Sequence, residues 1–186
     1  MKKELKIINA VVLAIVTLLY LGVRNFAFTG DERSGTEART AQEENGYFLV
    51  TKVVDGDTIN LSDGRKVRLI GVDTPEVHYS EKLLRDSKKT GQSIKTIQAL
   101  GRKASDFAKK LYAGKRVRLE YDVERKDRYK RTLAYVYLDN GLFVNAELIK
   151  EGYAQVMTIP PNVKFADHFL KLQKEAREAK RGLWKD

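Results

Sequence analysis

Four carboxylates and one arginine stand in two short, turn-rich stretches of the sequence. The stretch VVDGDTINL contains Asp55 and Asp57, and VRLIGVDTPE contains Arg68, Asp73 and Glu76. Convergent carboxylates repel one another unless a cation lies between them, and their oxygens are suitable ligands for a hard divalent ion. A planar guanidinium group can bind a phosphate through two parallel hydrogen bonds. In combination, these residue types predict metal-assisted chemistry at a phosphate group.

Taken separately, each of these features has a simpler interpretation. An Asp-Gly-Asp sequence is typical of a solvent-facing hairpin turn, and Glu76 could cap the start of a helix. Arg68 could lie over a sheet, and Arg131 could be an ordinary surface charge. Chain order favours convergence, because a hairpin would bring Asp57 to one end of a barrel and the next strand would deliver Asp73 to the same end.

The elements that must position these residues are mainly strands. Residues 47–54 are rich in β-branched and aromatic side chains and run directly into an Asp-Gly turn signal. In residues 65–72, apolar and basic side chains alternate, as a strand with one buried face requires. The predicted strands cover residues 47–54, 58–61, 65–72, 115–123 and 131–139.

The remaining elements are helices. Apolar residues recur at spacings of three and four between about residues 92 and 112, which predicts an amphipathic helix. A short helix is expected from Asn145, an acceptable N-cap, and a last amphipathic helix after Pro160-Pro161. The predicted fold class is α+β, mainly β: a five-stranded OB-fold Greek-key barrel with about three helices.

The amino-acid composition limits which reaction types, metals and binding partners are possible. Lysine and arginine number 35 against 25 acidic residues, which gives a net charge of +10 and favours a polyanionic partner. The chain has no cysteine and only two histidines, so thiol catalysis, disulfides and a conventional structural zinc site are excluded. Any metal would therefore be an oxygen-bound hard cation such as calcium or magnesium.

The amino terminus has the pattern of an export signal. Three lysines precede an uncharged, mostly apolar run at residues 7–23, which could be a cleaved signal, a retained membrane tether or a buried helix. The expected organisation is a signal peptide or membrane anchor at residues 1–28, a flexible linker at 29–46 and one globular domain at 47–186. Removal of residues 1–28 would take away four bases and one acid, so +7 of the +10 would remain.

Five motifs, in the same order, resemble staphylococcal (micrococcal) nuclease over nearly all of residues 47–186. They are VVDGDTINL, VRLIGVDTPE, DRYKRTLAYVYL, LFVNAELIKEGYA and the terminal RGLW. The resemblance implies an OB-fold barrel. It also implies a calcium-dependent endonuclease that acts on DNA and RNA and leaves 3′-phosphate ends.

The resemblance also implies roles for the residues of the metal site. Asp57 and Asp73 would be the calcium carboxylates, and the backbone carbonyl of Thr74 would be a further ligand. Glu76 would be the general base or the group that orients the attacking water.

A second group of residues would contact the substrate. Arg68 and Arg131 would bind the phosphate and stabilise the charge that develops in the transition state. Tyr129 would contact the phosphate or the leaving side, and Arg128 would contribute electrostatically.

The chain departs from the family pattern at three places. Lys130 stands where the family has a glycine before the second arginine, so the turn could aim Arg131 differently. The loop VMTIPPN lacks the tyrosines that stack on a nucleotide base, so nucleotide affinity should differ. Residues 77–101 are longer than the family norm, and their lysines and arginines form either a basic flap beside the site or a solvated helix face.

Three hypotheses follow. The first is an exported nuclease, secreted or membrane-anchored, with calcium as cofactor, DNA and RNA as substrates and a monomer as the default state. The alternative is a non-catalytic OB-fold nucleic-acid-binding module, for which a barrel and positive charge suffice. The third is a membrane-tethered domain whose basic residues bind anionic lipid.

Overall fold

The computed structural model of the chain describes residues 46–185. The predicted export segment at 1–28 and almost all of the predicted linker lie outside the described residues and stay predictions. Among residues 46–185, no helix is both long and apolar enough to cross a membrane.

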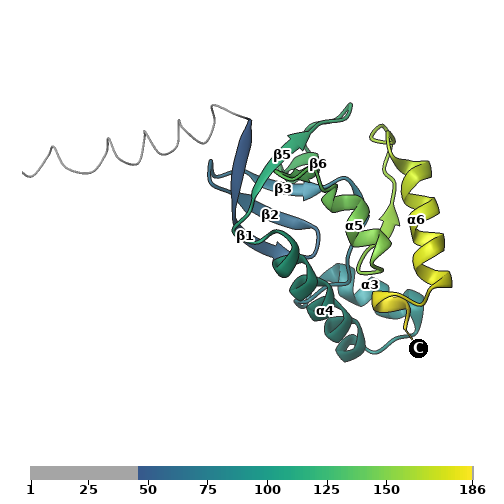
Figure 1. Cartoon of the computed structure of the whole chain (residues 1–186). Helices are drawn as coiled ribbons and strands as arrows, with labels where there is room; N and C mark the ends of the chain where they lie inside the picture. The colour runs from purple at the N-terminus through teal and green to yellow at the C-terminus, as the bar shows by residue number, and fades with distance from the viewer. Residues whose placement is uncertain (1–45, 186) are drawn as a thin grey trace, which may run out of the picture. The chain divides into compact units, whose positions relative to one another are not determined.

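The centre of the domain is a closed five-stranded barrel (Figure 1). Its strands are β1 (Tyr47–Asp55), β2 (Thr58–Leu61), β3 (Lys66–Leu69), β5 (Arg116–Glu120) and β6 (Thr132–Leu138), in the order β1-β2-β3-β6-β5. Neighbours pair antiparallel except β3 and β6, which pair parallel. The OB-type barrel predicted from the sequence is confirmed.

The barrel core follows the predicted alternation of side chains. In β3, Val67 and Leu69 are buried while Lys66 is exposed. The strand expected over residues 65–72 is interrupted, because β4 (Gly71–Asp73) leaves the barrel and pairs antiparallel with β7 (Gln155–Met157). Gly71 has φ +78°, and a Cβ there would lie 2.5 Å from the Phe169 ring. The break therefore depends on glycine, and it turns Asp73 toward the end of the barrel.

The part of the chain that the structure describes has four α-helices besides the barrel. They are α3 (Glu81–Thr90), α4 (Ile94–Tyr112), α5 (Val144–Lys150) and α6 (Ala166–Glu178), and a short 3₁₀ helix, η1 (Gly182–Trp184), follows. Helix α5 lies between the barrel and α6 (Figure 1). Helices α4, α5 and α6 match the predicted ones, whereas α3 is an additional helix within residues 77–101.

Asn145 does not cap α5, as the sequence suggested, but is buried inside the first turn of that helix. Its side-chain oxygen accepts from the Val136 backbone N–H at 2.9 Å, and its Nδ2 donates to the Ile70 carbonyl at 2.8 Å. Phe143 occupies the N-cap position and makes no side-chain capping bond. Asn145 thus links β6 to Ile70, the residue directly after β3. It therefore stabilises the chain between Arg68 and Asp73.

Candidate active site

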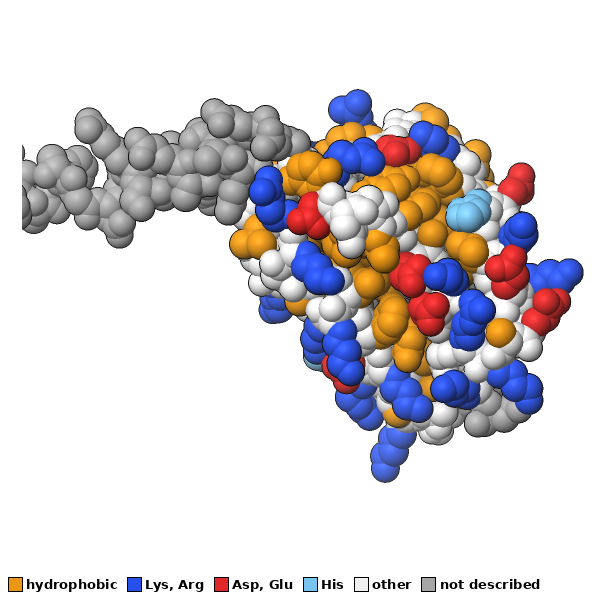
Figure 2. Space-filling model, viewed as in Figure 1, with side chains coloured by type: hydrophobic (Ala, Val, Ile, Leu, Met, Phe, Trp, Pro, Cys, Tyr) orange, Lys and Arg blue, Asp and Glu red, His pale blue; other side chains and the backbone are white. Residues whose placement is uncertain are grey.

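A cleft of about 700 Å³ opens beside the turn between β1 and β2, the end of β3 and strand β4. Its wall includes seven of the eight site residues predicted from the sequence: Asp57, Arg68, Asp73, Glu76, Arg128, Tyr129 and Arg131. The eighth, Thr74, is buried directly behind Asp57. On the face of the domain in Figure 2, lysine and arginine side chains are spread widely, and acidic side chains form smaller groups between them.

Asp57 is the most deeply fixed of the carboxylates, with 3% of its surface exposed. Its Oδ2 accepts from the Thr74 backbone N–H at 2.9 Å and from the Thr74 hydroxyl at 3.0 Å. Its Oδ1 accepts from the Thr58 hydroxyl at 3.1 Å and also contacts Arg68 Nη1. These donors satisfy the buried carboxylate oxygens and hold the side chain in place.

Helix α4 holds the turn before Asp57 in place. The Tyr112 hydroxyl donates to the Gly56 carbonyl at 2.9 Å. Burial, together with the negative charge of Asp55, raises the pKa of Tyr112 far above its ordinary value, so the hydroxyl keeps its proton. A Cβ at Gly56 would lie 2.5 Å from the Thr74 methyl group. Glycine is therefore required for the turn to pack against Thr74.

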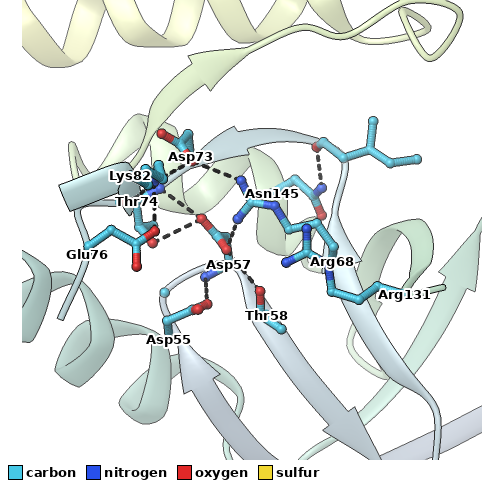
Figure 3. A network of polar contacts seen from close by, with 12 residues as sticks. Asp55, Asp57, Thr58, Arg68, Asp73, Thr74, Glu76, Lys82, Arg131 and Asn145 are labelled. Atoms are coloured by element: carbon cyan, nitrogen blue, oxygen red, sulfur yellow. Dashed lines mark hydrogen bonds and ion pairs between the residues drawn. The ribbon is translucent and has the colours of Figure 1, made fainter. Parts of the chain in front are cut away.

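Arg68 connects the two predicted calcium carboxylates. Its Nη1 contacts Asp57, and its Nη2 donates to Asp73 Oδ1 at 2.9 Å (Figure 3). In this view, Arg68 and Arg131 lie on one side of Asp57, and Glu76 and Lys82 lie on the other. Asp57 and Asp73 therefore lie close together at one end of the barrel, bridged by Arg68.

Glu76 is positioned through its backbone. Residues 75 and 76 pass over helix α4 at Gly101, where a Cβ would lie 2.6 Å from the Glu76 carbonyl oxygen and 2.7 Å from that of Pro75. The missing side chain at Gly101 lets the two segments touch. Glu76 therefore projects its carboxylate into the cleft from a backbone that a long helix supports.

Lys82, in the first turn of α3, lies among the predicted site oxygens. Its Nζ is 3.0 Å from Asp73 Oδ1, 3.0 Å from the Thr74 carbonyl and 3.1 Å from Glu76 Oε1 (Figure 3). Lys82 was not predicted as a site residue, because residues 77–101 show only a basic composition in the sequence. Arg85 also lies in the cleft wall, so α3 lies beside the site.

Arg131 is held by a turn at residues 127–131. Asp127 Oδ2 accepts from Arg131 Nε at 2.7 Å, and its Oδ1 accepts from the backbone N–H groups of Tyr129 and Arg131, each at 2.9 Å. Partial burial alone raises the pKa of Asp127, but the hydrogen bonds and charge of Arg131 outweigh burial, so the net pKa is lowered. Asp127 was not predicted as a site residue, although it begins the DRYKR motif.

Lys130 keeps this turn in the shape that glycine would favour. Its φ is +62°, in the left-handed region, and its N–H donates to the Asp127 carbonyl at 2.9 Å. The left-handed backbone at Lys130 is less favourable in energy than it would be at a glycine. The turn still directs Arg131 into the cleft. Next to it, the Tyr129 ring is 64% exposed and has Arg128 at 4.8 Å and Arg131 at 5.5 Å from its centroid.

The donor set suits a hard cation. Within residues 46–185, no group of three or more Asp, Glu, His or Cys side chains forms a metal cluster. The predicted ligands, however, are two carboxylates and one backbone carbonyl, and oxygen donors of this kind are what calcium prefers. The Lys82 ammonium already lies against Asp73 and the Thr74 carbonyl. A positive charge therefore fits at this position.

Similarity to known proteins extends over most of the chain. Residues 66–186 match the family model described as "Staphylococcal nuclease homologue". The chain is 39% identical over 190 residues to a thermonuclease of Staphylococcus intermedius, covering 99% of each protein. It is 35% identical over 182 residues to a thermonuclease of Staphylococcus hyicus, covering 96% of this chain and 98% of that one. Endonuclease YncB of Bacillus subtilis is 34% identical over 210 residues, covering 99% and 92%.

Proposed function

The chain belongs to the staphylococcal nuclease family, and from this premise we propose that it is a calcium-dependent endonuclease that cleaves DNA and RNA to leave 3′-phosphate ends. The family resemblance seen in the sequence is confirmed, and the chain is a nuclease that hydrolyses phosphodiester bonds. The observation that supports the finer proposal is the convergence of Asp57, Asp73 and Glu76 with two arginines in one cleft.

The two arginines would bind the scissile phosphate. Both line the cleft, and each already has carboxylate partners that orient its guanidinium group before substrate arrives. Paired N–H groups match two phosphate oxygens, and the positive charge stabilises the extra negative charge of the transition state. Arg68 would act from the barrel wall and Arg131 from the turn at residues 127–131.

Glu76 would accept a proton from the attacking water. As the water oxygen bonds to phosphorus, the bond from phosphorus to the 5′ oxygen breaks; that oxygen takes up a proton from solvent and leaves as the 5′ hydroxyl, while the phosphate stays on the 3′ side. General-base assistance of this kind contributes about 100- to 10,000-fold in rate. A calcium ion held by Asp57, Asp73 and the Thr74 carbonyl would polarise a phosphoryl oxygen and offset its charge.

Activity outside the cytoplasm is a further part of the proposal. It is supported by the basic and apolar pattern of residues 1–28, which lie outside the described residues. Antibody detection in medium, membrane and cytoplasmic fractions tests it. Protein found only in the cytoplasmic fraction would contradict export.

The nuclease proposal is tested by incubating the full chain with labelled single-stranded DNA, duplex DNA and RNA, in calcium or in excess chelator. We expect cleavage only with calcium, and products whose mobility changes when a phosphatase removes a 3′-phosphate. Absence of calcium-dependent cleavage on every substrate would contradict the proposal. Products with 5′-phosphate ends would contradict the assigned bond.

Two controls make this assay specific. Glu76→Gln protein purified in the same way reports any contaminating nuclease. A non-catalytic binding module would leave all three substrates intact and bind them equally in calcium and in chelator, so a binding assay under both conditions separates the alternatives.

A further inference from the structure

We propose that Lys82 is a built-in occupant of the cation site, which a divalent ion must displace before the nuclease can act. This inference rests on the proposed calcium site and assigns a role to helix α3. The Lys82 ammonium contacts Asp73, the Thr74 carbonyl and Glu76 at 3.0, 3.0 and 3.1 Å. An ammonium group has three N–H donors, and each has an acceptor here.

The ammonium and a metal ion compete for the same oxygens. Asp73 and the Thr74 carbonyl are two of the three ligands predicted for calcium, and calcium binds oxygen at about 2.3–2.6 Å. An ion at that distance from both oxygens would lie within a few ångströms of the Lys82 Nζ if the lysine stayed. Because like charges at that separation repel, the two cations exclude each other.

The position of Lys82 in its helix indicates that these contacts hold it there. It is the second residue of α3, where the partial positive charge of the helix N-terminus disfavours a cation. Leu83, which is fully buried, and the Ser80 cap fix the start of the helix. The lysine is therefore held beside the site by an anchored helix, while its flexible side chain could swing toward the cleft opening.

Displacement would have two consequences. The ion gains its ligands only when the lysine leaves, so Lys82 sets the calcium concentration at which the site fills. Glu76 loses its ammonium partner in the same step and becomes available to a water molecule. Filling the metal site and freeing the base are thus coupled through one side chain.

Arg85 provides a matched control for Lys82. It lies three residues further along α3 and lines the same cleft. Within residues 46–185, however, the side chains whose positive charge contacts Asp73, the Thr74 carbonyl or Glu76 are Arg68 and Lys82. Lys82→Met and Arg85→Met remove the same charge from the same helix, but only the first removes the contacts.

Binding of calcium ions alone, measured by isothermal titration calorimetry on the full chain, tests the proposal without nucleic acid. We expect Lys82→Met to bind calcium about 10-fold more tightly than the unmodified protein and Arg85→Met to change the affinity by less than about 2-fold. In chelator, Lys82→Met should melt at a lower temperature, because the carboxylates lose their counter-charge, whereas Arg85→Met should melt as before.

If Lys82→Met and Arg85→Met increase the calcium affinity equally, the increase comes from the loss of a positive charge near the cleft and not from the loss of the Lys82 contacts. That result would overturn the proposal. Unchanged or weaker binding by Lys82→Met and by a second variant, Lys82→Gln, would also overturn it. Neither of these outcomes touches the proposed nuclease activity, which the cleavage assay measures separately. If neither the unmodified protein nor any variant binds calcium, the proposed cation site is contradicted. The proposed calcium dependence and the proposed role of Lys82 would then both be wrong.

Discussion

The two sides of the cleft are built in different ways. On the barrel side, Arg68 lies on β3, whose backbone is paired on both edges, and Asp57 stands in the tight turn between β1 and β2 and is only 3% exposed. On the turn side, Arg131 stands at the end of an exposed turn that includes Tyr129, at 64% exposure, and the strained Lys130. Two of the three residues expected to hold the ion, Asp57 and Thr74, are thus buried, whereas one of the two phosphate ligands depends on a local turn.

This contrast indicates where sequence change is tolerated. Movement of Asp57 would disturb Thr58, Thr74 and Arg68 together, since it contacts all three. Movement of Arg131 would disturb chiefly its bonds to Asp127. We therefore expect changes on the barrel side to affect turnover strongly and changes on the turn side to affect mainly substrate binding or stability.

The largest effect is expected from Glu76→Gln. The amide keeps the shape of the side chain but cannot accept the proton of the attacking water, so kcat should fall by about 100-fold or more. Single-turnover cleavage of one oligonucleotide measures this, and Glu81→Gln, a change of an exposed acid at the start of α3, should leave kcat within about 2-fold. Unchanged turnover in Glu76→Gln would remove Glu76 from the mechanism.

The next effect is expected from Gly101→Ala. The added Cβ would meet the Glu76 and Pro75 carbonyls at 2.6 and 2.7 Å, so the segment that carries Glu76 must shift. A displacement of about 1 Å in a catalytic group can cost roughly 100-fold, and we expect a loss of about 10- to 100-fold in kcat. Gln98→Ala, one turn earlier on the same helix, is the control. Full activity in Gly101→Ala would show that the contact does not position Glu76.

On the turn side, Asp127→Asn should weaken the orientation of Arg131. The amide oxygen can still accept a hydrogen bond, but the charge that pairs with the guanidinium group is lost. We expect KM for a short oligonucleotide to rise by about 5- to 10-fold, with a smaller change in kcat. A large fall in kcat at unchanged KM would indicate instead that Arg131 acts only in the transition state.

The same carboxylate makes stability depend on pH in a defined direction. Because the folded pKa of Asp127 is lowered from its ordinary 3.8, its contribution is present above that value and is lost as pH falls below it through the folded pKa. Urea unfolding at pH 6 and at pH 3 should therefore show a difference between the unmodified protein and Asp127→Asn that shrinks at pH 3. A difference that grows at pH 3 would contradict the assigned direction.

The smallest effect is expected from Lys130→Gly. Glycine would remove the cost of a left-handed backbone at a residue with a side chain, about 1–2 kcal/mol. It would also increase the conformational entropy of the unfolded chain, which lowers stability by roughly 0.4–1 kcal/mol. The net gain in free energy of unfolding should be about 0.5 kcal/mol, measured by urea unfolding. A loss of stability would show that the Lys130 side chain contributes more than its backbone costs.

Much of the barrel side could be predicted from the sequence, because its signals are local. Alternating side chains in residues 65–72, with the turn sequences Asp55-Gly56 and Asp63-Gly64, define β2 and β3, and chain order places Asp57 and Asp73 at one end. The break at Gly71 was not predicted, since it depends on the distant Phe169 ring. The three-residue strand β7 is too short to show an alternating pattern.

Helix α3 and Lys82 could not be predicted in the same way. Residues 81–90 contain only two apolar side chains, Leu83 and Leu84, which are too few to show a helical period. The caps at Ser80 and Gly91 are the signals that could have found the helix. Which lysine of a basic stretch reaches an acidic cleft depends on how the helix packs, and sequence periodicity does not contain that information.

The most direct test of the central claim is a crystal structure of the Glu76→Gln full chain with calcium and a short DNA strand. The account predicts an ion bound by Asp57, Asp73 and the Thr74 carbonyl, a Lys82 ammonium displaced from these oxygens, and one phosphate that accepts hydrogen bonds from both Arg68 and Arg131. An ion absent from between the carboxylates, or a phosphate bound where the two arginines cannot reach it together, would contradict the account.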